Sequence, residues 1–169
     1  MKIAVIGYSG AGKSTLARAL GERYGIPVLH FDQVHWAPGW QERDKTEAHR
    51  IAHEFMEQPE WVIDGNYTKY EYQRRISEAD VIIFLDFPRL NCFFRAWKRY
   101  FCYRGKTRED MTEGCPEKMD PEFMRWILWE GRTKQKKENY QQIVRQYSKK
   151  TVVLRSQKDI DRYLEGLSC

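Results

Sequence analysis

The stretch KIAVIGYSGAGKSTLARAL, residues 2–20, decides the fold of this chain. It opens with a short apolar run, Ile3 to Ile6, which is partly β-branched and ends at a glycine, a pattern typical of a strand buried on both faces. Leu16, Leu20 and Tyr24 follow at four-residue spacing and predict the core stripe of a helix. A glycine-rich turn therefore joins a buried strand directly to a helix.

The turn itself, GYSGAGKST, matches the pattern GxxxxGK[ST] in the strand-to-helix setting that the pattern requires. Its glycines let several backbone N–H groups point at one phosphate, and the N-terminus of the helix adds positive charge. Lys13 is expected to reach the β- and γ-phosphates of ATP, and the Ser14 hydroxyl to coordinate Mg2+. The alternative is a glycine-rich turn that binds nothing. The expected phosphate-binding residues are Gly7, Ser9, Gly10, Ala11, Gly12, Lys13, Ser14 and Thr15.

The composition indicates a soluble protein with an anionic ligand. With 169 residues the chain is expected to form a single domain, 1–169, with a sizeable core. The 29 Lys and Arg residues against 24 Asp and Glu give a net charge of +5, which suits nucleotides and nucleic acids alike. The first apolar run is too short for a signal peptide or a membrane helix. A cytoplasmic location is expected, because the cysteines stand singly with no zinc or disulfide spacing: Cys92, Cys102, Cys115 and Cys169.

Strand-like and helix-like segments alternate along the whole chain. The segments PVLHFD (27–32), EWVID (60–64), DVIIFLD (80–86) and KTVVLRS (150–156) are expected to be further strands. Helices are expected over 45–58 and 69–77, after Pro88, from Pro121 and around Ile160, and a loop over 33–44. This alternation predicts an α/β fold: a three-layer arrangement with a mostly parallel five-stranded sheet, helices on both faces, and ligands at the carboxyl ends of the strands.

Two aspartates end strands in this arrangement. Asp64 lies in WVIDGNYTKY, where Asp-Gly after an apolar run is by itself a hairpin signal. The surrounding alternation instead favours a parallel strand that leads into a crossover. Asp86 ends the next strand, and if the two strands lie on either side of the first one, topology alone does not choose between the carboxylates as the group linked to magnesium.

The helix after Pro88 is expected to face the core with an apolar stripe made of Leu90, Phe93, Phe94, Trp97 and Phe101. Arg95 and Arg99 then fall on the opposite face, one turn apart, and point away from the core. The polar, glycine-bearing stretch 103–120 follows. A loop of that length inside a compact domain is usually functional, so an ordered lid is expected there.

The phosphate loop, the strand end VIDGNY, the helix FPRLNCFFRAWKR and the basic lid together resemble the adenylate-kinase-like, or nucleoside monophosphate kinase, superfamily of P-loop NTPases. Over nearly the whole chain the sequence is similar to small bacterial DNA topology modulation (FlaR-like) proteins. The resemblance implies a P-loop kinase fold with a lid insertion, and it assigns Asp64 to the magnesium-linked position. The family shows DGFP where this chain has DGNY, so the family's contact to the substrate base does not carry over.

The resemblance also suggests roles for charged residues around the loop. Asp32 is expected to orient an acceptor or a magnesium-bound water, with a helix cap or loop aspartate as the alternative. Arg95 and Arg99 would stabilise charge on the transferred phosphoryl group, because the guanidinium fork matches phosphate oxygens, with a solvated basic face as the alternative. Arg125 and Arg132 lie seven residues apart, on one face of the helix expected from Pro121, where such kinases bring further arginines over the phosphates on lid closure. The alternative for these two is an exposed basic run, GRTKQKK.

The acceptor is expected to bind within residues 33–60, near aromatic side chains that offer planar surfaces for stacking or are simply core: Trp36, Trp40, Tyr67 and Tyr70.

The favoured function is transfer of the ATP γ-phosphoryl group to a small acceptor, a nucleotide or nucleoside. One alternative is a nucleic-acid-associated ATPase, supported by the basic residues interleaved with aromatics after Phe93, but disfavoured because those aromatics are expected to be core. Another is a regulator that binds nucleotide without catalysis. The histidines show no convincing metal spacing, and the acceptor's identity and the oligomeric state stay open.

Overall fold

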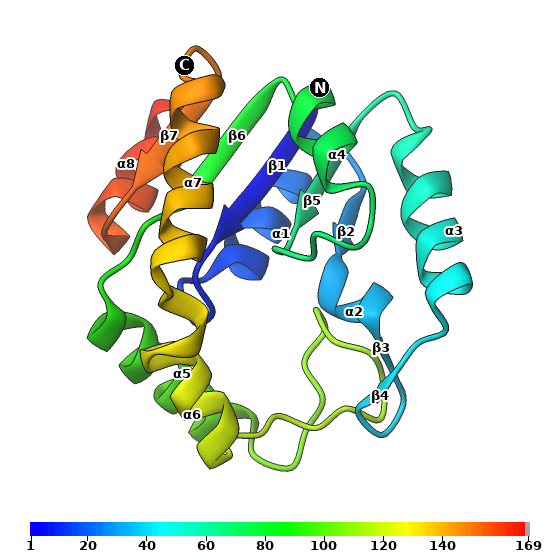
Figure 1. Cartoon of the computed structure of the whole chain (residues 1–169), viewed down its shortest axis with the longest axis vertical. Helices are drawn as coiled ribbons and strands as arrows, with labels where there is room; N and C mark the ends of the chain where they lie inside the picture. The colour runs from blue at the N-terminus through cyan, green and yellow to red at the C-terminus, as the bar shows by residue number, and fades with distance from the viewer. Residues whose placement is uncertain (168–169) are drawn as a thin grey trace.

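The computed structural model describes residues 1–167, so Cys169 lies outside the described residues. Within this range the chain forms a five-stranded parallel sheet of order β2-β5-β1-β6-β7, with α1 behind the sheet and α4 and α7 in front of it (Figure 1). The strands are β1 (Lys2–Gly7), β2 (Val28–His30), β5 (Trp61–Asp64), β6 (Val81–Leu85) and β7 (Thr151–Leu154). The predicted α/β architecture and its strands are confirmed.

The helices that surround the sheet are α1 (Lys13–Tyr24), α2 (Phe31–His35), α3 (Lys45–Met56), α4 (Tyr72–Glu78), α5 (Arg89–Tyr103), α6 (Pro121–Leu128), α7 (Lys134–Gln146) and α8 (Gln157–Gly166). No helix within residues 1–167 is long and apolar enough to span a bilayer. The segment expected as a strand over 27–32 ends at His30, because α2 begins at the next residue. The loop expected over 33–44 instead contains most of α2 and an antiparallel hairpin of β3 (Trp36–Ala37) and β4 (Gln41–Glu42).

β5 lies against the central strand β1 in parallel register, from Lys2 opposite Trp61 to Val5 opposite Asp64. This pairing rules out the hairpin interpretation of Asp64-Gly65. Gly65 turns the chain away from the sheet at φ 125°, and a Cβ at this position would lie 2.7 Å from the Cβ of Phe31. β6 pairs with the other edge of β1, so the two strands that lead to Asp64 and Asp86 flank the central strand as expected.

The orientation predicted for α5 is wrong. Its apolar stripe is exposed, with 59% of Leu90, 64% of Phe94 and 57% of Phe101 accessible to solvent. The face that packs on the protein carries the small residues Cys92 and Ala96, both buried. The side chains on this face must be small because α5 lies directly against the phosphate loop. A hydrophobic stripe shows which residues share a face of a helix, but it does not show which face is buried. In α5 the buried face is the one whose small residues let the helix backbone approach the phosphate loop closely.

The prediction of one long helix from Pro121 is also wrong. α6 ends at Leu128, a 3-10 turn (Glu130–Arg132) follows, and α7 starts a new helix capped by the Thr133 hydroxyl. Trp129, between α6 and the turn, has φ −134° and ψ −62°, which interrupts the helical path. Arg125 and Arg132 therefore do not share a helical face.

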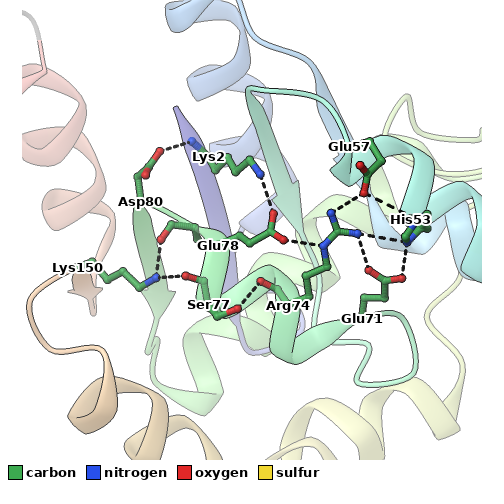
Figure 2. Close-up of polar contacts among 10 residues, drawn as sticks. Lys2, His53, Glu57, Glu71, Arg74, Ser77, Glu78, Asp80 and Lys150 are labelled. Atoms are coloured by element: carbon green, nitrogen blue, oxygen red, sulfur yellow. Dashed lines mark hydrogen bonds and ion pairs between the residues drawn. The ribbon is translucent and has the colours of Figure 1, made fainter.

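An ionic network joins α4 to the start of β1 and to the end of α3 (Figure 2). Arg74 forms ion pairs with Glu57 at 2.6 Å, Glu71 at 3.0 Å and Glu78 at 2.6 Å. Glu78 also binds the ammonium of Lys2, at the start of β1, at 2.7 Å. A network that shares one arginine among several carboxylates stabilises a fold better than an isolated surface pair does. These ion pairs therefore help to fix the position of α4.

Candidate active site

The phosphate loop closes around its own backbone between β1 and α1. The N–H of Ala11 donates to the carbonyl of Tyr8 at 3.1 Å, and Gly12, at φ 97°, precedes the first residue of α1. No side chain within the described range, 1–167, caps this end of α1, so its first backbone N–H groups are directed at the loop. This arrangement supplies donors and the positive end of a helix dipole to an anion.

Gly10 sets how closely α5 approaches the loop. Its φ is 80°, and a Cβ there would lie 2.4 Å from the backbone carbonyl oxygen of Cys92. Gly25 has a similar φ of 65°, but nothing lies within 4 Å of a Cβ built on it. The two glycines thus share the left-handed conformation and differ in the steric clash.

This pair gives a stability prediction. Gly25→Ala is expected to lower the free energy of unfolding by about 1–2 kcal/mol, the cost of a left-handed non-glycine residue. Gly10→Ala adds the displacement of α5 and is expected to cost about 2–4 kcal/mol. Urea unfolding of both variants measures the difference, and equal losses would show that α5 does not lie against the loop as described.

Lys13 points into the loop, where its ammonium donates to the carbonyl of Tyr8 at 3.2 Å. Burial lowers the pKa of Lys13, while the nearby carboxylates of Asp64 and Asp32 oppose that shift. The ammonium therefore lies between the loop backbone and two carboxylates, Asp64 at the end of β5 and Asp32 in the first turn of α2.

Asp64 is buried at the end of β5 and binds two side chains with its two oxygens. The hydroxyl of Ser14 donates to Oδ2 at 2.8 Å, and Nδ1 of His30 lies 2.5 Å from Oδ1. Asp86 lies on the other side of β1, is more exposed, and pairs with Arg155 at 3.5 Å. The structure therefore brings Asp64, and not Asp86, into contact with the serine of the phosphate loop.

Asn66 and Tyr67, which stand where the superfamily that the sequence resembles has Phe-Pro, both contact the predicted site. Asn66 binds the backbone of Gly7 reciprocally: the Gly7 N–H donates to Oδ1 at 3.1 Å, and Nδ2 donates to the Gly7 carbonyl at 2.5 Å. The Tyr67 hydroxyl donates to Oδ1 of Asp32 at 2.8 Å. Asp32 itself lies in the first turn of α2, just beyond the strand end where it was expected.

Arg95 and Arg132 lie against the loop, while Arg99, one turn further along α5, pairs with Glu117 of the excursion and lowers the pKa of Lys13 through its charge. A Cβ on Gly12 would lie 2.6 Å from Nη2 of Arg95, and the Arg132 guanidinium lies 3.7 Å from the centre of the Tyr8 ring. The expectation that Arg95 and Arg99 point away from the core is wrong, because the exposed stripe of α5 places them on its inner side. Arg132 also donates to the carbonyl of Phe87 at 2.9 Å.

Arg125 lies apart from these three arginines. Its side chain is 64% exposed and forms an ion pair with Glu130 at 2.5 Å. Its neighbour Trp126 contacts the loop instead, donating from Nε1 to the Ser9 hydroxyl at 3.1 Å. Nucleotide binding by Arg125 stays a prediction.

The stretch expected as a lid is an ordered excursion between α5 and α6. It packs over α2 and the β3–β4 hairpin, where the Thr112 hydroxyl donates to the carbonyl of Trp36 at 2.6 Å and Nε1 of Trp40 donates to the carbonyl of Pro116 at 3.2 Å. These contacts join the lid stretch to part of the predicted acceptor region, 33–60.

Charged side chains connect the same excursion to the phosphate loop. Glu117 pairs with Arg99 at 3.0 Å and with Arg108 at 2.6 Å. Burial lowers the pKa of Arg99, reinforced by Arg108 and opposed by Glu117. Burial raises the pKa of the Asp110 carboxyl, but the charge of Arg108 and the nearby Ser14 hydroxyl and His30 outweigh it, so the net pKa is lowered. The excursion thus brings the Asp110 carboxylate close to Ser14, which the sequence pattern did not reveal.

The predicted stacking residues form one aromatic cluster beside Asp32. The rings of Trp36 and Trp40 lie 5.5 Å apart, and those of Tyr67 and Tyr70 lie 5.9 Å apart. Tyr70 is only 2% exposed and its hydroxyl lies 2.8 Å from Nδ1 of His35, so it belongs to the core. Trp36 and Trp40 are half-buried, and the Lys118 ammonium lies over the Trp40 ring, 4.4 Å from its centre.

The residues present fit a magnesium–nucleotide complex. Mg2+ prefers oxygen ligands and keeps several waters, so it is held by one or two protein oxygens together with substrate phosphates. The Ser14 hydroxyl and the Asp64 carboxylate meet beside the loop and offer such oxygens. Within residues 1–167 no group of three or more His, Cys, Asp or Glu side chains forms a metal cage.

No protein-family model and no curated protein sequence matches the chain. Solved structures do match. Shikimate kinase from Bacteroides thetaiotaomicron is 18% identical, with a TM-score of 0.56 over 99% of this chain and 96% of that one. A gluconokinase from Sinorhizobium meliloti 1021 is 18% identical, with a TM-score of 0.54 over 98% and 94%. Shikimate kinase from Acinetobacter baumannii, in complex with shikimate, is 14% identical, with a TM-score of 0.56 over 98% and 90%.

At these identities the likeness shows the fold alone. The fold is the P-loop kinase type of α/β fold, and it is shared along nearly the full length of each chain. The similarity to DNA topology modulation proteins is not tested by these structures and stays a prediction.

Proposed function

We propose that the protein is an ATP-dependent phosphotransferase that moves the γ-phosphoryl group of ATP to a small acceptor. The observation that carries this proposal is the convergence of Lys13, the Ser14–Asp64 pair and Arg95 of α5 on one glycine loop. Phosphoryl transfer needs charge stabilisation and in-line positioning more than a covalent nucleophile, and these residues supply charge where the phosphates would bind.

Each group has a role in this proposal. Lys13 binds the β- and γ-phosphates, and Arg95, Arg99 and Arg132 stabilise charge on the transferred group. Ser14 and Asp64 would hold Mg2+, which supplies neutralisation of phosphate charge when it is bound. The stretch 103–120, the predicted lid, would cover the loop from the acceptor side and exclude water.

Asp32 and the aromatic cluster define the acceptor side. Asp32 is held by the Tyr67 hydroxyl and orients a hydroxyl or phosphate of the acceptor, while Trp36 and Trp40 contact its planar part. A nucleoside or nucleotide has both features, so we propose this class of acceptor. A reducing cytoplasm suits the free thiols at Cys92, Cys102 and Cys115.

A coupled assay of ADP release tests the proposal. The protein is mixed with ATP, Mg2+ and single members of a panel of nucleosides, mononucleotides and small polyols. We expect ADP release that depends on one acceptor class. Tight ATP binding with negligible ADP release across the panel would favour a non-catalytic regulator and sink the phosphotransferase.

A nucleic-acid-associated ATPase is a second candidate, and one observation favours it. The aromatics of α5 were expected to be core, yet Phe94, Trp97 and Phe101 are 64%, 42% and 57% exposed. The segment from Arg89 to Lys106 that carries them contains basic residues and no acidic one. Exposed rings beside cations are the features by which proteins bind single-stranded nucleic acid.

This candidate gives its own prediction. If it is right, the protein binds a single-stranded oligonucleotide with strong salt dependence, and Phe94→Ser with Trp97→Ser weakens binding by about 1–3 kcal/mol per lost stacking contact. Trp129→Ser is the matched control, since Trp129 is 59% exposed but lies outside α5. Fluorescence anisotropy at several salt concentrations measures the affinities. Equal weakening by the control, or no binding at all, would eliminate this candidate.

A further inference from the structure

His30 makes the shortest polar contact to the carboxylate at the centre of the site. It ends β2, directly opposite Asp64 in the parallel register of β2 and β5. Its Nδ1 lies 2.5 Å from Oδ1 of Asp64, and the two residues are only 8% and 3% exposed. An ionised carboxylate can only accept hydrogen bonds, so Nδ1 carries the proton and donates to it.

The two oxygens of Asp64 are divided between different partners. Oδ1 is occupied by His30, while Oδ2 accepts from the Ser14 hydroxyl at 2.8 Å. A carboxylate fixed at one oxygen cannot rotate freely about its terminal torsion, which is otherwise broad. The imidazole therefore determines which Asp64 oxygen is directed at the phosphate loop.

Other charged groups face the imidazole, and they are consistent with a donor role. Asp110 of the lid stretch and Asp32 of α2 add negative charge around the ring. Burial alone lowers the pKa of His30, but the hydrogen bond and charge of Asp64, with Asp110 and Asp32, raise it overall. Acidic groups thus surround His30 from β5, α2 and the lid stretch.

We propose that His30 is a positioning residue for the magnesium–nucleotide complex: by donating from Nδ1 to Oδ1 it holds Asp64 so that Oδ2 faces Ser14 and the metal. The proposal rests on the proposed function, because it concerns the magnesium that accompanies ATP. Residues that orient a metal-binding carboxylate in this way typically change metal affinity or activity by roughly 10- to 100-fold when they are removed.

The test separates a hydrogen-bond donor from a space-filling side chain. His30→Asn keeps an amide N–H at the same distance from the backbone as Nδ1, whereas His30→Phe keeps an aromatic ring without a donor. The protein is titrated with ATP at a series of Mg2+ concentrations, and calorimetry gives the Mg2+ concentration at which the gain in ATP affinity is half-maximal. No acceptor or turnover is needed for this readout.

We expect His30→Phe and His30→Ala to raise that Mg2+ concentration by roughly tenfold or more, while their affinity for ATP in EDTA stays near that of the wild type. His30→Asn is expected to stay within about threefold of the wild type because the donor is kept. His35→Ala is the matched control: His35 is also buried but binds Tyr70 and not Asp64, so its Mg2+ requirement is expected to be unchanged.

Two results would overturn the proposal: a wild-type Mg2+ requirement in His30→Ala, or a requirement in His30→Phe equal to that in His30→Asn. Failure of the proposed function has a different signature, since the wild-type protein would then bind ATP without transferring its phosphoryl group or not bind it at all. Urea unfolding of each variant separates a lost contact from a lost fold.

Discussion

Lys13→Ala is expected to lower acceptor-dependent ADP release by at least roughly 10²- to 10³-fold, the usual effect of removing one preorganised donor to a reacting group. The ammonium lies inside the phosphate loop and donates to the carbonyl of Tyr8, so its loss removes the positive charge directed at the phosphates. Steady-state rates at saturating ATP measure the loss in the chemical step separately from any loss in binding.

Two further variants make the Lys13 result specific. Lys13→Arg keeps the charge, but a planar fork does not fit a cradle shaped for a compact ammonium, so we expect little rescue. Lys137→Ala removes an exposed lysine on α7 and is expected to leave the rate unchanged. If Lys13→Ala released ADP at the wild-type rate, the phosphate loop would not be the site of reaction.

Asp64→Asn is expected to have the second-largest effect, a loss of roughly 10- to 100-fold together with a higher Mg2+ requirement. The substitution keeps the size of the side chain but removes the negative charge that accepts from Ser14 and His30. Asp86→Asn breaks an ion pair with the exposed Arg155, and exposed pairs contribute about 0–1 kcal/mol, so its rate is expected to stay near that of the wild type.

The comparison of the two aspartates is made at several Mg2+ concentrations. A normal Mg2+ requirement in Asp64→Asn, alongside a raised one in Asp86→Asn, would reverse the assignment. The two strands are symmetric about β1, so the contact between Asp64 and Ser14 is the observation that distinguishes them.

The sheet and the phosphate loop could be predicted because both depend on local sequence. The short apolar run before Gly7 is typical of a buried strand, and the glycines that follow favour the loop conformation. The parallel pairing of Trp61 to Asp64 followed from the alternation of elements, which overrode a strong hairpin signal at Asp64-Gly65. For the first strand and the phosphate loop, local pattern and global topology agree. For Asp64-Gly65 they disagree, and the topology decides.

The orientation of α5 could not be predicted because periodicity does not say which face is buried. The most apolar stripe, with Leu90 and Phe94, is exposed, and burial went to Cys92 and Ala96, which allow the helix to approach Gly10. Which face of α5 is buried depends on the distance between the helix backbone and the phosphate loop. The sequence of the helix alone does not specify that distance. The same error reversed the expected direction of Arg95 and Arg99.

The contacts of His30 and Asn66 were missed for a related reason. Each binds a residue that is distant in sequence: His30 is paired with Asp64 only through the register of β2 on β5, and Asn66 with Gly7 only because β5 lies beside β1. A short strand of three residues fixes that register, and a shift of one residue would move the histidine to the other face. The departure of DGNY from DGFP indicated that these positions differ, and in the structure Asn66 binds the phosphate loop while Tyr67 binds Asp32.

The most direct test of the central claim follows the γ-phosphoryl group itself. ATP labelled at the γ-phosphate is incubated with Mg2+, the protein and the acceptor class that stimulates ADP release, and the products are separated by mass spectrometry. The account predicts label in the acceptor in an amount equal to the ADP formed, and transfer by Lys13→Ala that is slower by at least roughly 10²- to 10³-fold. Label found only in inorganic phosphate, at a rate that depends on single-stranded DNA, would contradict it.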